Sequence, residues 1–266
     1  MTAAESVEIA WGDRQVRIEH QWIAPERRDR PLVVFLHEGL GSLAMWKDFP
    51  RQLCDAANLR GLVYSRPGYG GSTPRRTDER WGSDFMHRQA IEVLPALRDA
   101  LHIGDLPWLF GHSDGGSIAL LHAARFPHSL AGLVVVAPHI VVEEFGLASI
   151  RKAREAYATT DLKQRLSRYH GDVDSAFRGW NDIWLDPAFE HWNIEAELDS
   201  ITCPVLAVQG LDDEYGTLAQ IRGIARRVPG TQLLELPDCG HSPHRDQPQR
   251  LIEAARRFIV ERIGRR

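Results

Sequence analysis

Short apolar runs alternate with longer amphipathic stretches along most of the chain. The runs are not broken by alternating polar residues, and they lie at 32–36, 62–64, 108–110, 133–136, 205–208 and 232–236. Continuous runs of this length, rich in β-branched residues, are typical of strands that are covered on both faces. The pattern therefore predicts a buried, mostly parallel sheet.

The stretches between these runs have the apolar spacing of helices that bury one face. We predict helices at 49–58, 84–101, 117–126, 217–227 and 247–263. Two earlier segments, 7–10 and 15–22, flank the dipeptide Gly12-Asp13, which is typical of a hairpin turn. We expect an α/β fold, a doubly wound sheet with an antiparallel hairpin at its edge.

One segment interrupts this alternation. Residues 139–196 are helix-like, are rich in tryptophan and include no convincing core strand. The apolar runs of the sheet resume after it, so we expect an insertion that lies over one end of the sheet. The predicted core then consists of residues 1–138 and 197–266.

The sharpest local signal is Gly111-His112-Ser113-Asp114-Gly115, a G-x-S-x-G motif between a predicted strand and a helix. A serine in this turn is forced into a strained backbone conformation, and the flanking glycines leave room for its neighbours. The Oγ atom of Ser113 is then expected to project from the carboxyl edge of the sheet. Its place at a helix N-terminus puts backbone N–H groups, first that of Asp114, beside the charge of an acyl intermediate.

A serine hydroxyl is a weak nucleophile and needs a base that is oriented by a carboxylate. The candidates in loops that we expect at the same edge of the sheet are Asp212, Asp213, His37, His112, His241 and His244. The two aspartates are adjacent, so their side chains cannot both face the base. We expect His37 and His112 to bond to the backbone of their own turns.

The motif around Ser113, followed by Asp213 and then by His241, has the order nucleophile, acid, base. In these motifs the chain resembles the α/β hydrolase superfamily, from the first hairpin to the last helix. The resemblance implies an α/β-hydrolase fold in which Ser113 is the nucleophile, His241 the base and Asp213 the acid. Asp212 is then a loop carboxylate, and His244 a loop-packing residue.

The resemblance also implies a loop that forms part of an oxyanion hole, and Glu38-Gly39-Leu40 occupies its place. It assigns the oxyanion to the amides of Asp114 and Gly39, with Leu40 as their neighbour. Family members commonly have a glycine where Glu38 stands. Glu38 is either a structural anchor, for example to Arg66, or a polar group that faces the substrate.

A further glycine-rich turn, at 65–72, resembles the family pattern Asp-x-x-Gly-x-Gly-x-Ser, with Ser65 in place of the aspartate. Its glycines suit positive φ angles and close backbone packing. We expect this turn to be part of the scaffold beneath the site.

Many members of this superfamily carry a cap over the nucleophile, and the resemblance implies such a cap at 139–196. We expect its tryptophans to hold the cap on the sheet, with at least one of them lining the substrate pocket. A pocket of this kind would suit an apolar or aromatic acyl group. The residues that we expect to line it are Glu38, Trp46, Phe145, Trp180 and Trp184.

Charge and composition argue against several other classes. The chain has 32 Lys and Arg against 36 Asp and Glu, a net charge of −4, so it has no basic footprint for nucleic acid. The longest strongly apolar run, 130–142, contains Pro138 and is shorter than the ~20 residues that span a membrane. The N-terminal sequence has neither the basic nor the apolar part of a secretory signal, which favours a cytoplasmic protein.

No motif indicates a metal or a cofactor. The zinc motif H-E-x-x-H is not completed, because residue 41 is glycine, and neither glycine-rich nucleotide motif occurs. The pair His241 and His244 lacks a matching set of ligands beyond Cys239 and Asp246.

These observations predict a cofactor-free serine hydrolase that cleaves a small ester, thioester or related carbonyl compound through an acyl-enzyme at Ser113. Because one fold hosts many reactions, two alternatives stay open. One is a hydrolase of carbon–carbon bonds in aromatic ring-cleavage products. The other is a protein that binds a small ligand without turning it over. The expected partner is a small molecule, and a homo-oligomer is compatible with the sequence.

Overall fold

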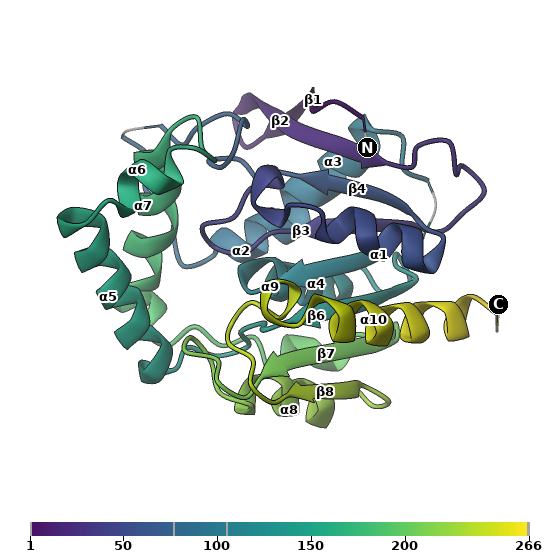
Figure 1. Cartoon of the computed structure of the whole chain (residues 1–266). Coiled ribbons are helices and arrows are strands. Elements are labelled where there is room, and N and C mark those ends of the chain that lie inside the picture. Colours follow the sequence, from purple (N-terminus) through teal and green to yellow (C-terminus); the bar gives the residue numbers. More distant parts are fainter. Residues whose placement is uncertain (1, 77, 105, 265–266) are drawn as a thin grey trace.

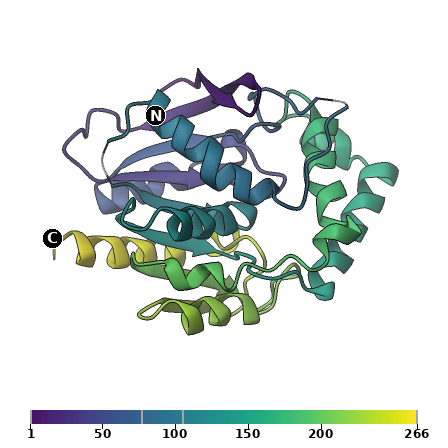
Figure 2. The same cartoon turned by 180° about the vertical axis from the view of Figure 1, so that it is seen from behind.

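One sheet of eight strands, in the order β1-β2-β4-β3-β5-β6-β7-β8, forms the centre of the computed structural model, which describes residues 2–76, 78–104 and 106–264. Helices cover both of its faces, so the core has three layers (Figures 1 and 2). The strands are β1 (Glu5–Trp11), β2 (Arg14–Ile23), β3 (Leu32–Leu36), β4 (Arg60–Tyr64), β5 (Trp108–His112), β6 (Gly132–Val136), β7 (Val205–Gly210) and β8 (Gln232–Leu236).

The predicted hairpin is confirmed at one edge of the sheet. Strands β1 and β2 pair antiparallel, and Gly12 has a φ of 63° in the turn between them. Strand β2 also pairs antiparallel with β4, whereas all the other neighbours are parallel. The sheet is therefore mostly parallel, as the apolar pattern predicts.

The central strands are buried along their whole length, which explains why their sequences are continuous apolar runs. Every residue of β3, β5, β6 and β7 is buried. In the register of the sheet Leu36 lies beside Gly111, and His112 lies beside Val136. The parallel strands therefore end together, and the loops that follow them meet at one edge, where ligand sites of such sheets form.

Two groups of helices cover the sheet. On the face seen in Figure 1 are α1 (Phe49–Ala57) and α10 (Pro248–Ile263), which pack on β3, β5 and β6. On the face seen in Figure 2 are α2 (Phe85–Arg88), η2 (Gln89–Val93), α3 (Leu94–Ala100), α4 (Asp114–Arg125) and α8 (Ala219–Arg227). Of the helices in the described residues, none is both long enough and apolar enough to cross a lipid bilayer.

Two helices differ from their predicted form. The helix predicted at 84–101 contains a π-helical turn, η2, immediately before Pro95 in α3. Proline has no N–H to donate to the preceding turn, so the regular hydrogen-bond ladder is interrupted there. The helix predicted at 117–126 begins earlier, at Asp114, because it follows directly on the turn at Ser113.

Between β6 and β7 the chain leaves the sheet and forms α5 (Glu144–Thr159), α6 (Leu162–Leu166) and α7 (Val173–Trp184). Figures 1 and 2 show these helices beyond the edge at which the parallel strands end. The two segments that connect them to the core are hydrogen-bonded to each other, from Ile194 N to Ile140 O at 2.8 Å and from Val142 N to Trp192 O at 3.1 Å. The shorter elements are η1 (Leu43–Trp46), η3 (Pro187–Phe189), η4 (Glu197–Ser200) and α9 (Pro243–Asp246).

Candidate active site

Ser113 lies in the turn between β5 and α4 with φ 53° and ψ −121°, a conformation that side-chain-bearing residues rarely adopt. Glycines on either side make this turn possible. A Cβ atom on Gly111 would overlap the carbonyl of Gly115, and one on Gly115 would overlap the carbonyl of Leu36. The turn therefore places Ser113 where the sheet ends, directly at the N-terminus of α4.

The structure brings Ser113, His241 and Asp213 together from three loops. His241 Nε2 lies 2.9 Å from Ser113 Oγ, and His241 Nδ1 lies 2.8 Å from Asp213 Oδ1 and 3.0 Å from Oδ2. With the proton on Nδ1 donated to the carboxylate, Nε2 is free to accept the hydroxyl proton of Ser113. The adjacent Asp212 is exposed and takes no part in this arrangement.

The carboxylate of Asp213 is held by further donors. Gln209 Nε2 donates to it at 2.7 Å, and the amides of Tyr215 and Gly216 donate at 2.8 and 3.3 Å. Burial would raise the pKa of Asp213, but the hydrogen bond and charge of His241 and the Tyr215 amide outweigh burial and lower this pKa. Asp213 therefore stays ionised beside the imidazole.

His241 responds in the opposite direction. Burial opposes its protonation, but the hydrogen bond and negative charge of Asp213, supported by Glu214 and Glu38, raise the pKa of His241 above its ordinary value. The pair is thus arranged to stabilise an imidazolium that forms when the histidine takes up a proton.

Backbone amides surround Ser113 on two sides. Asp114 is the first residue of α4, where an amide has no carbonyl partner within the helix. Across from it, Gly41 N donates to Glu38 O at 3.0 Å and closes a tight turn around Gly39 and Leu40. Asp114, Gly39 and Leu40, the residues predicted for the oxyanion hole, all line the same cavity as Ser113.

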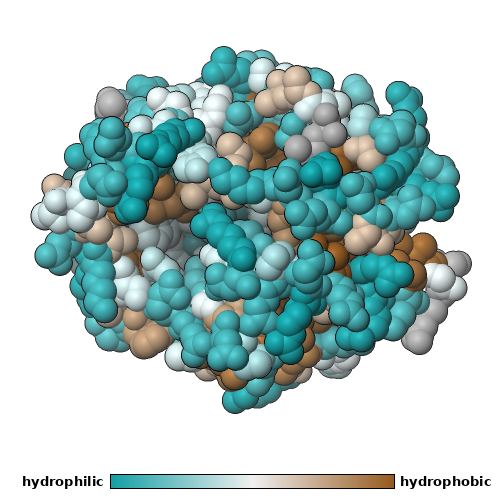
Figure 3. Space-filling view, in the orientation of Figure 1, coloured by the Kyte–Doolittle hydropathy of each residue, from teal (hydrophilic) through white to brown (hydrophobic). Residues whose placement is uncertain are grey.

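This cavity has a volume of about 240 Å³. Figure 3 shows the surface hollowed between the helical insertion and the core. The apolar part of its lining consists of Leu40, Ile150, Trp180, Trp184 and Tyr215. The polar part includes Glu38, His112, Asp114, His139, Glu214 and Ser242. No lysine or arginine of the described chain lines it.

Two of the residues expected in this pocket lie elsewhere, so their assignment is wrong. Trp46 is 2% exposed and packs in the core below the sheet edge, stacked on Phe49 and edge-on to Phe110. Phe145 is 53% exposed, because the buried side of α5 is formed by Gly146, Leu147 and Ile150. The other three, Glu38, Trp180 and Trp184, do line the cavity.

Glu38 is an anchor, although not to Arg66 through its side chain. Its carboxylate lies 3.6 Å from His112 Nδ1 and 3.4 Å from Arg245 Nη2. Burial would raise the pKa of Glu38, but His112, His244 and Arg245 lower it well below its ordinary value. Arg66 Nη2 donates instead to the backbone carbonyl of Glu38, at 2.8 Å.

The remaining loop histidines have structural partners. His37 Nδ1 lies 2.7 Å from the carbonyl of Glu38, within its own turn as expected. The expectation for His112 is wrong, because its Nε2 lies 2.7 Å from the carbonyl of His241 in another loop and not from the backbone of its own turn. His244 packs between Trp46 and the ring of His112, and this packing agrees with its expected role in the loop.

The glycine-rich turn at 65–72 is part of the scaffold, with a carboxylate that comes from a neighbouring strand. Ser65 Oγ donates to Glu19 Oε2 at 2.7 Å, and Gly71 N donates to the same oxygen at 2.9 Å. Glu19 of β2 thus takes the place of the aspartate that the sequence pattern lacks at Ser65. Gly70, with φ 57°, has no room for a side chain beside Ser65.

Sequence analysis did not identify His139 as a site residue. Its ring lies edge-on to Trp184 at 4.9 Å and 6.0 Å from the ring of His241. Burial lowers the pKa of His139 to about 3, so its imidazole is neutral at neutral pH. Its position just after β6, at the edge where the other site loops meet, is the signal that could have identified it.

A strained serine between the fifth strand and the following helix of a mostly parallel sheet is typical of α/β hydrolases. A sequence model of the alpha/beta hydrolase family matches residues 33–254, and the chain belongs to this family. Among the described residues, no three His, Cys, Asp or Glu side chains gather as a metal-binding group.

Similar proteins include enzymes of different reactions. The chain is 28% identical over 260 residues to a pimeloyl-[acyl-carrier protein] methyl ester esterase of Aromatoleum aromaticum, with 83% of this chain and 95% of the relative covered. It is 26% identical over 238 residues to a 2-hydroxy-6-oxo-6-phenylhexa-2,4-dienoate hydrolase of Burkholderia cepacia, with 79% and 80% covered. A solved esterase of Thermogutta terrifontis has the same fold, with a TM-score of 0.74, 19% identity, and 98% and 99% of the two chains covered.

Proposed function

We propose that this protein is a serine hydrolase that cleaves a small ester, thioester or related carbonyl substrate through an acyl-enzyme at Ser113. The observation that carries the proposal is the hydrogen-bonded series from Ser113 Oγ through His241 to Asp213, at 2.9 and 2.8 Å, on the wall of a cavity. A nucleophile, a base and an orienting carboxylate in contact are the elements that acyl transfer requires.

In the proposed mechanism Ser113 Oγ attacks the substrate carbonyl carbon while His241 Nε2 takes the hydroxyl proton. Asp213 stabilises the imidazolium, and the amides of Asp114 and Gly39 donate to the oxyanion of the tetrahedral intermediate. His241 then returns the proton to the leaving group, and the acyl-enzyme forms. Water activated by His241 attacks the acyl group in the second half, and Ser113 leaves with the proton. No cofactor takes part in these steps.

The helical insertion at 139–196 is proposed to act as a cap that shapes the acyl site. Trp180 and Trp184 of α7 and Ile150 of α5 bring apolar surface to the cavity. Gly39 supports this arrangement, since a Cβ atom there would overlap the indole of Trp180. An apolar or aromatic acyl group fits such a lining.

A second candidate is hydrolysis of a carbon–carbon bond, and the similarity to the Burkholderia cepacia hydrolase favours it. Both reactions leave an acyl fragment and need the same three residues. They differ in the leaving group, which is an oxygen or sulfur atom in one case and a carbon atom in the other.

The first experiment is a pre-steady-state assay of purified protein with p-nitrophenyl esters of increasing acyl length and one aromatic ester. We expect a burst of nitrophenol in the wild type and no burst in Ser113→Ala, which should keep its folded circular dichroism spectrum. Near wild-type turnover by the variant would contradict the proposal. If no ester is turned over, labelling of Ser113 by a fluorophosphonate would direct the search to carbon–carbon substrates, and the absence of labelling would favour a non-catalytic binding protein.

A further inference from the structure

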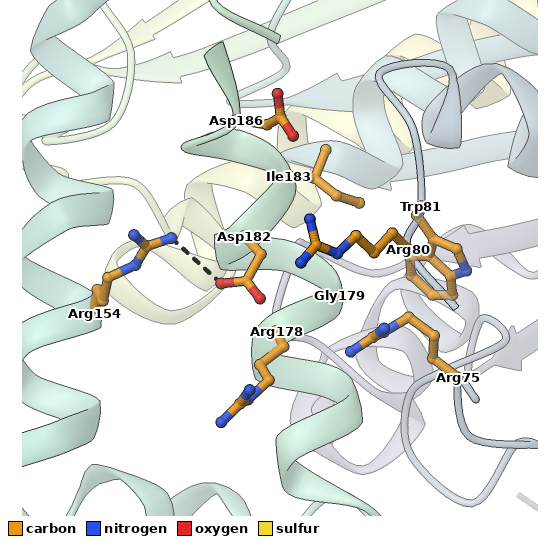
Figure 4. Close-up of a pocket in the computed structure, with 9 residues that line it drawn as sticks. All are labelled: Arg75, Arg80, Trp81, Arg154, Arg178, Gly179, Asp182, Ile183 and Asp186. Carbon is orange, nitrogen blue, oxygen red and sulfur yellow. Dashed lines mark hydrogen bonds and ion pairs between the residues drawn. The ribbon is translucent and has the colours of Figure 1, made fainter. Parts of the chain in front are cut away.

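A second cleft, of about 210 Å³, lies beside α7 and has no lining residue in common with the cavity at Ser113. One wall is the loop that follows the 65–72 turn, with Arg75, Arg80 and Trp81, and the other wall is α7 (Figure 4). The helix separates the two sites, because Trp180 lines the catalytic cavity whereas the neighbouring Gly179 lines the cleft.

The cleft carries an excess of positive charge in a chain whose net charge is −4. Its charged lining residues are Arg75, Arg80, Arg154, Arg178, Asp182 and Asp186. Arg154 is already paired, with Asp182 at 3.3 Å and with Asn181 at 2.8 Å. Asp186 is engaged as well, because its carboxylate accepts from the amide of Ala188 at 2.8 Å.

The other three arginines form no ion pair with the described residues. The guanidinium groups of Arg80 and Arg178 form no ion pair or hydrogen bond within the part of the chain that the structure describes. Arg75 donates to the backbone carbonyls of Glu79 and Arg76, which are uncharged, and its buried Nε has no partner among the described residues. Figure 4 shows Arg75 and Arg80 extending from the loop toward α7, whereas Arg178 extends from α7 away from both.

We propose that this cleft binds the phosphate group of a small organic phosphate. Two guanidinium groups that extend from one loop, those of Arg75 and Arg80, can donate to several oxygens of a tetrahedral dianion, whereas one bidentate arginine suffices for a single carboxylate. The catalytic cavity is not an alternative place for such a group, since its lining includes the carboxylates of Glu38, Asp114 and Glu214 and no cationic side chain of the described chain.

The indole of Trp81 forms the apolar wall of the cleft. It lies so close to α7 that a Cβ atom on Gly179 would be 3.1 Å from its ring. Its Nε1 donates to Glu79 at 3.1 Å, which fixes the ring in place. The organic part of the ligand would pack on this ring, and a phosphate that carries an aromatic or other planar group fits best.

A phosphate bound here would join the core to the insertion. The loop and α7 already touch, because Arg75 N donates to Ser175 Oγ at 2.7 Å. The ligand would lie between the loop and α7 and would receive charge-assisted hydrogen bonds from the loop. Helix α7 also carries Trp180 and Trp184, so a ligand in the cleft would be separated from the acyl site by this one helix.

The test is isothermal titration calorimetry of the full-length protein with phenyl phosphate and with inorganic phosphate, at constant ionic strength set by chloride. We expect saturable binding at one site, tighter for phenyl phosphate. In the variant Arg80→Gln the dissociation constant should rise roughly tenfold or more, because a charge-assisted donor is lost. The control Arg168→Gln removes an exposed arginine of the insertion outside the cleft and should bind as the wild type does.

Two outcomes would overturn the proposal: no saturable binding by the wild type, or equal binding by the wild type and an Arg80→Gln variant with an unchanged circular dichroism spectrum. Calorimetry does not depend on catalysis, so it is independent of the proposed hydrolase function.

Discussion

The carboxylate of Asp213 accepts hydrogen bonds from a side-chain amide, two backbone amides and the imidazole of His241. Three of these donors are neutral, and the histidine is the one among the four that can become a cation. Protonation of His241 is therefore the change that strengthens its attraction to the Asp213 carboxylate. The raised pKa of His241 and the lowered pKa of Asp213 are two expressions of the same contact. This contact determines the pH at which the base becomes available.

The pH dependence of kcat/KM tests this contact. His241 must be neutral to accept the proton of Ser113, so activity should fall as the pH drops through its raised pKa, above the ordinary value near 6.5. Asp213→Asn removes the charge that favours the imidazolium, so the acid limb should move to lower pH. The maximal kcat should also drop by roughly 10⁴-fold, the scale expected when a triad carboxylate is neutralised.

The matched control for this pH profile is Asp212→Asn. Asp212 is the adjacent, exposed carboxylate, and its substitution should leave both the acid limb and kcat unchanged. An Asp213→Asn variant that keeps the acid limb and the rate of the wild type would show that another group orients His241.

At this scale the sequence was informative where a residue's role follows from its place in a turn. Ser113 could be selected because its motif lies between a strand and a helix, whereas Asp213 and His241 were chosen among several loop candidates through the resemblance to the family. The partner of Ser65 could not be predicted, because Glu19 is far away in the sequence and reaches the turn only through the pairing of β2 with β4. The position of Trp46 depends in the same way on packing that no local pattern encodes.

Among the helices of the insertion, α7 contributes the most residues to the lining of the cavity beside Ser113. Its buried face contributes Trp180 and Trp184 to the cavity, and Trp184 Nε1 donates to Asp114 at 3.2 Å. Burial raises the pKa of this Asp114 carboxyl, although Arg66 opposes the effect. This hydrogen bond connects α7 to the first turn of α4, next to Ser113. A substitution on the aromatic face of α7 can therefore change the surroundings of Ser113.

We expect Trp180→Phe to widen the acyl site, because a smaller ring replaces the indole that packs on Gly39. The ratio of kcat/KM for a bulky acyl ester to that for a short one should rise about tenfold, the usual scale of discrimination by pocket volume. The measurement is a p-nitrophenyl ester series. Trp192→Phe is the control, since Trp192 stacks on Phe189 at 5.3 Å and does not line the cavity.

An unchanged ratio in Trp180→Phe would show that α7 does not shape the proposed acyl site. A similar rise in both variants would show that the selectivity depends on the stability of the insertion rather than on the volume of the cavity.

The elements themselves could be predicted to different degrees. Burial on both faces makes β3 and its parallel neighbours continuous apolar runs, so the strands were recognisable, and their alternation with helices predicted a mostly parallel sheet. Only contacts across the boundary could show which side of each insertion helix meets the core. Of the two aromatic residues, Trp180 lines the cavity, whereas Phe145, which has the same apolar character, lies on the exposed side of α5.

At the scale of the whole molecule, the stability of the insertion depends on the segments that connect it to the core. Gln220 of α8 is fully buried and reaches this connection. Its Oε1 accepts from Ile140 N at 2.7 Å and from Val141 N at 3.3 Å, while its Nε2 donates to Val141 O at 3.0 Å and to Glu143 at 2.7 Å. One side chain thus satisfies backbone groups that lie outside any sheet or helix.

We expect Gln220→Ala to loosen the insertion while the sheet stays intact. Buried backbone groups would lose their partners, which should lower the free energy of unfolding by roughly 2 to 4 kcal/mol. Urea unfolding measures the loss, and hydrogen exchange should show faster opening at residues 140–142 than in β5. The control Gln164→Ala replaces an exposed glutamine of α6 and should change neither quantity. If exchange in Gln220→Ala accelerates equally in β5 and at residues 140–142, the insertion and the sheet open as one cooperative unit, and Gln220 does not control the insertion separately.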